Sequence, residues 1–238
     1  MRILNQAASP TMKQHILIGL VFLVGIGGSV YIYATRDAAR KNAALLQARA
    51  HVAKQIEVGS HRVTQEMERK AREVARTAAA ELSAVADDGV VMTLADVTEQ
   101  GTKPAVLIFI KDKCPCSAAA EPYYAQLHRA YGHALNFVGV IDGDLDVARQ
   151  WRSFHDTPYP ILCDPDLAIV RNYHVTNSAY VALITPQGII ETLWPGFSDD
   201  LLQEMGRTFA AKAGIDPVPL VFQDAPAQPY AGCPFFLD

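Results

Sequence analysis

The sequence has few cysteines and lacks the common motifs of nucleotide-binding proteins and serine hydrolases. Four cysteines in 238 residues are too few for a small domain held together by disulfides. There is no Walker loop, GxGxxG segment or nucleophile-elbow serine, and the histidines do not show His-x-x-x-His spacing. Neither a cofactor nor a resident metal ion is therefore expected from these motifs.

Positive charge is scarce in the C-terminal part of the chain. Residues 89–238 carry nine Lys and Arg against seventeen Asp and Glu. Because nucleic-acid binding depends on a basic surface, no nucleic-acid partner is expected. With 50% hydrophobic and 19% charged residues, the chain can hold one full domain and accessory segments.

Charge is absent from residues 16–34. This run approaches the ~20 apolar residues that cross a bilayer, and Tyr31 and Tyr33 fall where interfacial aromatics are expected. A cleaved signal peptide is the alternative. The run, however, exceeds the ~7–15 residues of a signal core, and no small-x-small cleavage site follows. We expect an N-terminal tail over residues 1–15 and a single-pass anchor over residues 16–34, with basic residues on both sides.

Proline is absent from Arg36 to Ala86, a segment rich in Ala, Arg, Glu and Lys. Apolar residues recur there at spacings of three and four: Val63, Met67, Ala71, Val74, Ala78, Leu82 and Val85. The pattern predicts a helical stalk over residues 36–88, broken near Gly59-Ser60. The stalk either self-associates, as a coiled coil would, or is a single solvated helix that lies on the domain or on the bilayer. His51 and His61 are expected to be solvated stalk residues.

Strand and helix patterns alternate over residues 89–213, the predicted globular domain. Strands are predicted at 105–110, 136–141 and 160–163, helices at 117–131, 145–154 and 167–173, a hairpin at 180–193, and a closing helix at 198–211 capped by Ser198. This alternation predicts an α/β fold whose mixed sheet is covered on both faces and carries an antiparallel edge.

Two cysteines separated by one residue follow the first predicted strand. Pro115 suits the first position of a helix, which places Cys114 at the cap beside the positive helix end. Lys111 and Lys113 add positive charge. A thiolate in such a position attacks disulfides or binds soft metals. The alternative is that Cys114 and Cys116 are small apolar residues packed at the helix start.

Four segments carry a resemblance to the thioredoxin fold. They are Val106-Leu-Ile-Phe before Cys114, Glu121-Pro122, Tyr159-Pro-Ile-Leu-Cys-Asp-Pro-Asp166 with Tyr173-His-Val175, and Val181-Ala-Leu-Ile-Thr-Pro-Gln-Gly188 with Gly196. In order and spacing they resemble membrane-anchored redoxins related to TlpA/ResA-type proteins and peroxiredoxins. The resemblance implies a thioredoxin-like domain with a thiol active site.

On that resemblance, Cys114 corresponds to the family's nucleophilic cysteine and Pro122 to the proline that bends the first helix. The family's second cysteine position holds Ser117. The cis-proline position holds Ala179, which is expected to be trans because a non-proline cis bond costs about 2.5–4 kcal/mol. A typical peroxidase is not expected, because Lys111 stands where that site has a threonine.

The other cysteines offer several partners for Cys114. Cys116 is near enough in sequence for a disulfide, although the small ring would be strained. Cys163 ends a predicted strand and is either a resolving thiol or a packing residue. Cys233 lies in a proline-rich tail, residues 214–238, which is expected to run extended and to dock on its own domain or on a neighbour.

Three functions of different class remain open. The first is a membrane-tethered thiol-disulfide oxidoreductase that acts on protein thiols, with Cys114 as nucleophile and Cys116, or else Cys163 or Cys233, resolving. The second is a non-catalytic accessory or scaffold subunit of a membrane complex. The third is Cu(I) binding through Cys114 and Cys116. The resemblance to redoxins of this type implies that the protein is anchored in a bacterial inner membrane. Its domain would then lie in the periplasm, where disulfides persist.

Overall fold

The computed structural model describes residues 34–55 and 60–236 of the chain. The chain divides into two compact units, residues 1–44 and 45–238, and the second holds the α/β domain. Residues 34–55 are helical. In the described part of the chain, no helix has the length and apolar character needed to cross a bilayer. The predicted anchor, apart from Ala34, and the predicted tail before it lie outside the described residues.

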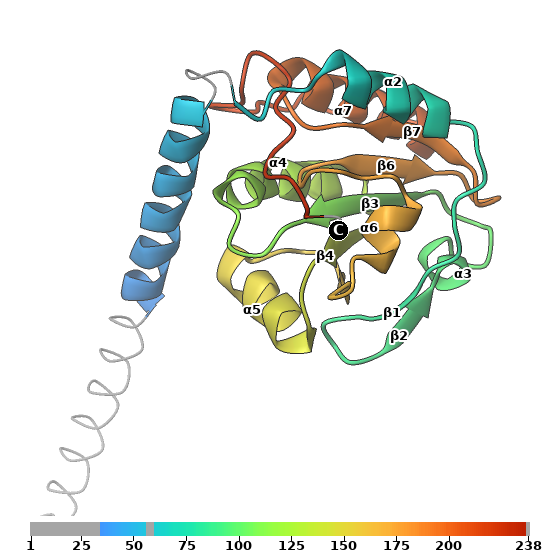
Figure 1. Ribbon diagram of the computed structural model, residues 1–238, viewed down its shortest axis with the longest axis horizontal. Coiled ribbons are helices and arrows are strands. Elements are labelled where there is room, and N and C mark those ends of the chain that lie inside the picture. Colours follow the sequence, from blue (N-terminus) through green and yellow to red (C-terminus); the bar gives the residue numbers. More distant parts are fainter. Residues whose placement is uncertain (1–33, 56–59, 237–238) are drawn as a thin grey trace, which may run out of the picture. The chain divides into compact units, whose positions relative to one another are not determined.

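A five-stranded mixed sheet forms the centre of the domain (Figure 1). In spatial order its strands are β5 (Ile161–Cys163), β4 (Asn136–Ile141), β3 (Ala105–Ile110), β6 (Val181–Ile184) and β7 (Ile190–Trp194). β3 and β4, and β4 and β5, pair in parallel, whereas β6 and β7 are antiparallel to their neighbours. The predicted α/β architecture with an antiparallel hairpin at the edge is confirmed.

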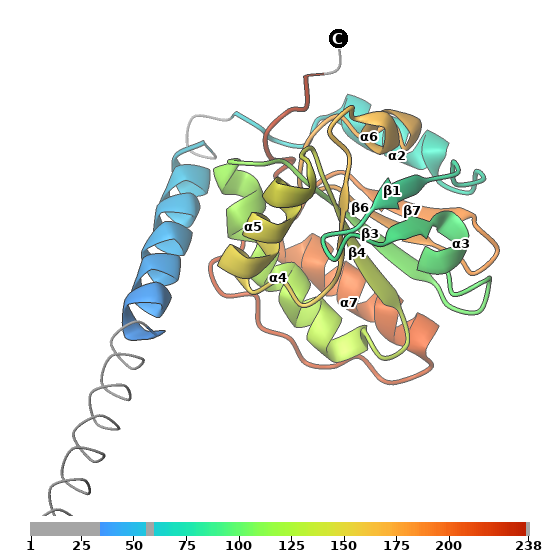
Figure 2. The ribbon, with the colours of Figure 1, turned by 90° about the horizontal axis from the view of Figure 1, so that it is seen from below.

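Helices cover both faces of this sheet (Figure 2). α4 (Pro115–Tyr131), α5 (Leu145–His155) and α7 (Asp199–Ala213) pack on one face, and α2 (Gln65–Val74), α3 (Leu94–Val97) and α6 (Ala168–Asn172) on the other. Along β3, Val106, Ile108 and Ile110 enter the first core, and Leu107 and Phe109 enter the second. Because successive side chains of a strand point to opposite faces, a strand buried on both sides reads as a continuous apolar run.

Local sequence signals set several boundaries of these elements. Pro115 is the first residue of α4, and Cys114 is its N-cap. Ser198 caps α7 by accepting a hydrogen bond from the Leu201 amide at 3.2 Å. Both positions are the ones that the sequence predicted. Proline suits the first helical position because its missing N–H would have no partner there, and a serine cap accepts a hydrogen bond from an amide of the first turn.

Within the predicted stalk, residues 65–74 are helical as α2, but the helix prediction is wrong for residues 75–88. The apolar residues Met67 and Ala71 do share one face of α2, but that face packs against the domain. After α2, residues 76–79 pair with the edge at β7, and Ala86 pairs with Leu162 in β5 at the opposite edge. Between them, β1 (Ser83–Val85) pairs with β2 (Val91–Thr93). Hydrogen bonding at the exposed edges of the sheet has overridden the helix propensity of this alanine-rich segment.

The C-terminal tail docks on its own domain, one of the two alternatives for it. Tyr230 and Ala231 are fully buried, and Phe222 and Phe235 nearly so. Tyr230 forms β-bridges with both Arg62 and Phe197. The tail therefore joins the segment before α2 to the segment before α7, and its apolar residues complete the two cores.

Candidate functional site

The candidate site lies at the N-terminus of α4, where β3 ends. Cys114 has extended backbone geometry and offers no side-chain hydrogen bond to the helix. The first turn of α4 therefore keeps amide groups that have no partner within the helix, next to the Cys114 sulfur. Ser117 is buried, and its hydroxyl accepts a hydrogen bond from the Lys111 amide at 3.1 Å. This contact ties the loop after β3 to the first turn of α4.

Cys114 forms a disulfide with Cys233 in the C-terminal tail. The two Cα atoms are 6.4 Å apart, within the usual range for a disulfide, and the residues are separated by 119 positions in sequence. Cys114 is only 4% exposed. The structure thus does not contain the pairing of Cys114 with Cys116 that their sequence proximity suggested. A single intervening residue leaves little room for an unstrained ring, whereas the docked tail brings Cys233 to Cys114 directly.

Cys116 is a free thiol beside this disulfide. Its sulfur lies 3.4 Å from the Cys233 sulfur and 3.5 Å from the Tyr230 hydroxyl. Burial raises the pKa of the Cys116 thiol, and the hydrogen bond with Tyr230 opposes that effect. The site therefore holds three sulfur atoms, two of them joined and the third in contact.

Backbone hydrogen bonds hold the tail against the loop that precedes β6. The Ser178 amide donates to the Cys233 carbonyl at 2.8 Å, and the Cys233 amide donates to the Ser178 hydroxyl at 3.1 Å. The Asn177 side-chain amide donates to the Gly232 carbonyl at 2.9 Å. Gly232 has φ +77°, and a Cβ there would lie 2.6 Å from the Ser178 hydroxyl oxygen. Only glycine allows the tail to approach this closely.

His61 also reaches the site, although it was expected to be a solvated stalk residue. Its Nδ1 lies 3.1 Å from the Tyr230 hydroxyl and 4.0 Å from the Cys116 sulfur. Burial, and to a lesser degree the charge of His51, lower the pKa of His61. The expectation was wrong because the Ala231 amide donates to the His61 carbonyl at 2.7 Å, which pairs this segment with the tail.

The two lysines near the site are engaged elsewhere. Lys111 Nζ lies 3.7 Å from Asp142 and 4.6 Å from the ring centre of Phe236. Lys113 is exposed and pairs with Asp112 at 3.2 Å. Lys111 therefore links the loop after β3 to the end of the tail by a cation–π contact.

Ala179 and Cys163 complete the residues singled out in the sequence. No cis peptide bond occurs among the described residues, so Ala179 is trans as expected. Its carbonyl accepts a hydrogen bond from the Tyr124 hydroxyl at 2.9 Å.

Cys163 is a partly exposed free thiol at the end of β5 and is not among the clustered ligand atoms of His61, Cys116 and Cys233. Burial, reinforced by Asp144 and Asp87, raises the pKa of the Cys163 thiol.

Glu121 is a buried acid in the same helix as Cys116. Its Oε1 accepts hydrogen bonds from the hydroxyls of Thr157 and Tyr159, both at 2.8 Å. Burial raises the pKa of Glu121 to about 7, and the two hydrogen bonds only partly offset this effect. α4 therefore carries a carboxyl group that changes its charge near neutral pH.

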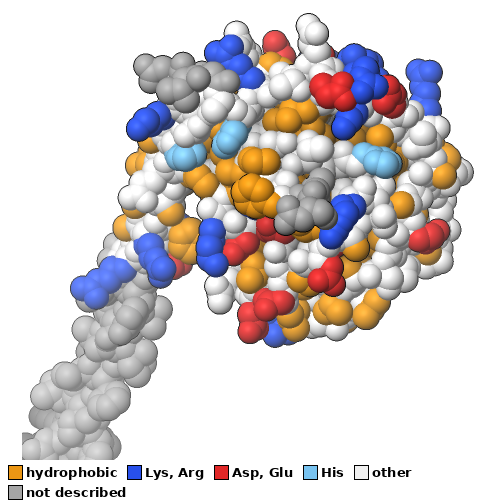
Figure 3. Space-filling model, in the orientation of Figure 1, with side chains coloured by type: hydrophobic (Ala, Val, Ile, Leu, Met, Phe, Trp, Pro, Cys, Tyr) orange, Lys and Arg blue, Asp and Glu red, His pale blue; other side chains and the backbone are white. Residues whose placement is uncertain are grey.

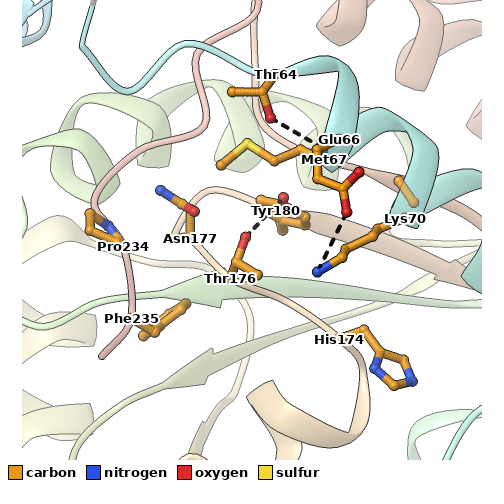
Figure 4. A pocket seen from close by; sticks show the side chains of 11 residues that line it. Thr64, Glu66, Met67, Lys70, His174, Thr176, Asn177, Tyr180, Pro234 and Phe235 are labelled. Atoms are coloured by element: carbon orange, nitrogen blue, oxygen red, sulfur yellow. Dashed lines mark hydrogen bonds and ion pairs between the residues drawn. The ribbon is translucent and has the colours of Figure 1, made fainter. Parts of the chain in front are cut away.

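A groove of about 400 Å³ lies beside the docked tail (Figure 4). Met67 from α2, Tyr180 and Phe235 supply apolar walls, and Thr64 and Asn177 supply polar groups. On the face seen in Figure 3, hydrophobic side chains gather near the end of the chain, with charged groups around them. Phe236 is 74% exposed, so part of the tail presents an apolar side chain to solvent.

This arrangement of sheet, helix and thiols has recognisable relatives. Residues 75–192 match the AhpC/TSA family. Over this segment, just under half of the chain, the domain is similar to the AhpC/TSA redoxins. A comparison with curated protein sequences finds no match.

Solved structures share the fold of this domain at low sequence identity. An uncharacterized conserved protein from Geobacillus kaustophilus has TM-score 0.56 and 18% identity, covering 69% of this chain and 92% of its own. A candidate thiol:disulfide interchange protein DsbE from Chlorobium tepidum has TM-score 0.53 and 20% identity, covering 59% and 98%. The thioredoxin domain of a thiol-disulfide oxidoreductase from Bacteroides vulgatus has TM-score 0.50 and 16% identity, covering 57% and 97%. These similarities establish the thioredoxin-like fold that the sequence motifs indicated.

Sequence reasoning missed three residues of the site: His61, Ser178 and Tyr230. Tyr230 lies three positions before Cys233, and its place in an apolar tail was the one available signal. No sequence signal pointed to His61 or Ser178, because these residues reach the sulfur atoms only after the tail has docked between their segments.

Proposed function

We propose that this protein is a thiol-disulfide oxidoreductase in which Cys114 is the nucleophile and Cys233 resolves. The observation that carries the proposal is the Cys114–Cys233 disulfide at the N-terminus of α4, with a third sulfur 3.4 Å away. The positive helix end and the amides of its first turn favour a thiolate at Cys114. The match to the AhpC/TSA family and the thioredoxin-like fold support a redox role in general.

The reaction begins with the reduced protein. The Cys114 thiolate attacks one sulfur of a disulfide in a partner protein, forms a mixed disulfide and releases the partner's other sulfur as a thiolate. The Cys233 thiolate then attacks the Cys114 sulfur, forms the Cys114–Cys233 disulfide and releases the partner's second thiolate. Two electrons pass from Cys114 and Cys233 to the partner, and an external dithiol restores the reduced state.

Cys116 supplies an internal exchange step. Its thiolate attacks the Cys233 sulfur, which moves the disulfide to Cys116–Cys233 and frees the Cys114 thiolate without any net oxidation or reduction. Burial of the Cys116 thiol disfavours this step, because the thiolate is the attacking form. The Tyr230 hydroxyl at 3.5 Å can donate to that thiolate and favour it.

Access to Cys114 requires local release of the tail. Cys114 is nearly buried, and hydrogen bonds between Ser178 and Cys233 and from Asn177 to Gly232 hold this part of the tail. Reduction of the disulfide removes the covalent link of the tail to α4 and leaves its hydrogen bonds and packing contacts. We propose that a partner segment in extended conformation then replaces residues 232–234 along residues 177–178.

The test is trapping of the mixed disulfide on full-length protein. Reduced wild type and the Cys233→Ser variant are exposed to an excess of a disulfide-containing peptide, and the products are mapped by mass spectrometry. We expect Cys233→Ser to accumulate the peptide on Cys114, and wild type to release it and form Cys114–Cys233. Cys163→Ser is the matched control and should behave as wild type.

Failure of Cys114 to react in the Cys233→Ser variant would overturn the catalytic proposal. The redoxin fold would then serve as a scaffold, the other function considered, with the Cys114–Cys233 bond as a structural staple.

We further propose that the protein is tethered to a bacterial inner membrane by residues 16–34 and that its domain lies in the periplasm. The uncharged run and the disulfide support this location. Membrane fractionation of expressing cells, followed by protease treatment of spheroplasts, tests it. Degradation of the domain in intact spheroplasts is expected, and full protection would contradict it.

A further inference from the structure

Cys116 and Cys233, the two thiols proposed to exchange with Cys114, lie beside His61 in one cluster of metal-binding atoms. Nδ1 or Nε2 of His61 and the sulfur atoms of Cys116 and Cys233 all lie within 4.8 Å of one another. The three residues come from the segment before α2, from α4 and from the tail. The docked tail therefore brings one imidazole and two sulfur atoms together in one place.

The spacing of these atoms suits a single bound ion. Ligands held about 2.0–2.3 Å from a metal at tetrahedral or trigonal angles lie roughly 3.3–4.0 Å from one another. The sulfur atoms of Cys116 and Cys233 are 3.4 Å apart, and Cys116 Sγ lies 4.0 Å from His61 Nδ1. The remaining pair, His61 and Cys233, lies within 4.8 Å, so the donor atoms would need to move by less than about 1 Å to share one ion.

We infer that the reduced protein binds one Cu(I) ion through His61, Cys116 and Cys233. Thiolates select soft cations such as Cu(I), and imidazole is also a good ligand for copper. Zn(II) almost always takes four ligands in a closed protein site, and this cluster supplies three. This ligand set differs from the pair of Cys114 and Cys116 considered from the sequence.

Binding of copper and formation of the disulfide exclude each other. In the oxidised protein Cys233 is bonded to Cys114 and has no thiolate to offer. Transfer of two electrons and two protons from a dithiol breaks that bond and yields two thiols. Cu(I) then displaces the protons of Cys116 and Cys233, so metal binding is confined to the reduced state.

Tyr230 acts as a positioning residue in this arrangement. Its hydroxyl lies 3.5 Å from the Cys116 sulfur. A hydrogen bond donated to the Cys116 thiolate would offset part of the cost of burying its charge. His61 is partly exposed, which leaves a path by which the ion can enter.

Competition with a chromophoric chelator tests the inference. Full-length protein, reduced and kept anaerobic, is titrated with Cu(I) against bicinchoninate, and the oxidised protein is titrated in parallel. We expect one equivalent to bind to the reduced protein, with at least about 100-fold weaker binding after oxidation, since even loss of an outer-shell partner costs 10–100-fold.

Variants identify the ligands. We expect a loss of Cu(I) affinity of at least about 10-fold in each of three variants: Cys116→Ser, Cys233→Ser and His61→Gln. Removal of an outer-shell partner alone costs about 10–100-fold, and these residues are direct ligands. The matched controls Cys163→Ser and His133→Gln should bind as wild type. Cys114→Ser should also bind as wild type, because Cys114 is not a ligand. X-ray absorption of the complex should show two sulfur atoms and one nitrogen atom around copper.

Equal affinity of the oxidised and reduced proteins, or unchanged binding in Cys116→Ser, would overturn the inference. Tight binding of Zn(II) that is lost in Cys114→Ser would also overturn it, since that result would mean a four-ligand zinc site. The peptide-trapping experiment with a copper chelator present reports on disulfide exchange alone. Failure of metal binding and failure of exchange are therefore separate results.

Discussion

Ser178 and Cys233 form a reciprocal pair of hydrogen bonds across the site. The Ser178 amide donates to the Cys233 carbonyl at 2.8 Å, and the Ser178 hydroxyl accepts from the Cys233 amide at 3.1 Å. Together with the disulfide, this pair holds Cys233 at the N-terminus of α4, where the tail has no helix or strand of its own. The reactivity of Cys114 consequently depends on how firmly one short segment is docked.

Weakening the docked tail should therefore expose Cys114. In Gly232→Ala, the added methyl group would collide with Ser178 and the residue would keep a positive φ, at a cost of about 1–3 kcal/mol. Each 1.4 kcal/mol raises the open fraction about tenfold. We expect Cys114 to be alkylated about 5- to 150-fold faster in reduced Gly232→Ala than in reduced wild type, measured by quenched labelling and mass spectrometry.

Gly214→Ala is the matched control for this experiment. Gly214 also has a positive φ, +68°, but a Cβ there has no neighbour within 4 Å. Its substitution tests backbone strain without a collision. Equal acceleration in both variants would show that overall destabilisation, and not docking of residue 232, controls the exposure of Cys114.

The Cys114–Cys233 disulfide should contribute strongly to stability. It joins residues 119 positions apart, and constraint of so long a loop is worth about 2–5 kcal/mol. We expect oxidised wild type to exceed reduced wild type in free energy of unfolding by an amount in this range, measured by urea denaturation. Cys163→Ser should retain the difference and Cys233→Ser should lose it. A difference below about 0.5 kcal/mol would mean that the tail adds little constraint.

Glu121 should make stability depend on pH near neutrality. Its pKa is about 7 in the folded state and near 4.5 when unfolded, so the folded state retains the proton between these values. The free energy of unfolding should therefore fall as pH rises from 4.5 to 7, by about 3 kcal/mol in total, and stay level above pH 7.

Glu121→Gln provides the measurement. The amide oxygen can still accept from Thr157 and Tyr159, but the side chain no longer titrates. In urea denaturation, we expect the free energy of unfolding of this variant, measured relative to that of wild type, to be larger at pH 8 than at pH 5. The exposed Glu81→Gln serves as the control and should follow wild type at both pH values. Parallel pH profiles for Glu121→Gln and wild type would contradict the raised pKa of Glu121.

The contact between Cys116 and Cys233 predicts an alternative disulfide. Removal of Cys114 in Cys114→Ser leaves these two thiols 3.4 Å apart in the wild-type geometry. Mild oxidation of this variant should link Cys116 to Cys233, as peptide mapping without reduction would show. Cys163 should remain free to alkylate in the same sample. Formation of a Cys163 linkage instead would mean that the tail does not stay docked beside Cys116.

Much of the domain follows from short-range sequence patterns. Strands β3 and β4, the proline at the start of α4, the hairpin of β6 and β7 and the serine cap of α7 all lie where the sequence predicts them. Each depends on residues within about one turn or one strand of each other. Side-chain alternation, capping and turn chemistry act over that distance and need no tertiary contact.

The sequence by itself determined that a cysteine would cap α4 beside a thioredoxin-like sheet, and that the proline-rich tail would run extended. Only the tertiary structure decided that Cys233 is the partner of Cys114, that His61 reaches Cys116, and that residues 76–86 pair with the sheet edges instead of extending a helix. The physical reason is that these contacts join segments 55 to 119 positions apart. Their pairing depends on which chain segments satisfy the open edges and apolar faces of the folded sheet, and local propensity carries no information about that choice.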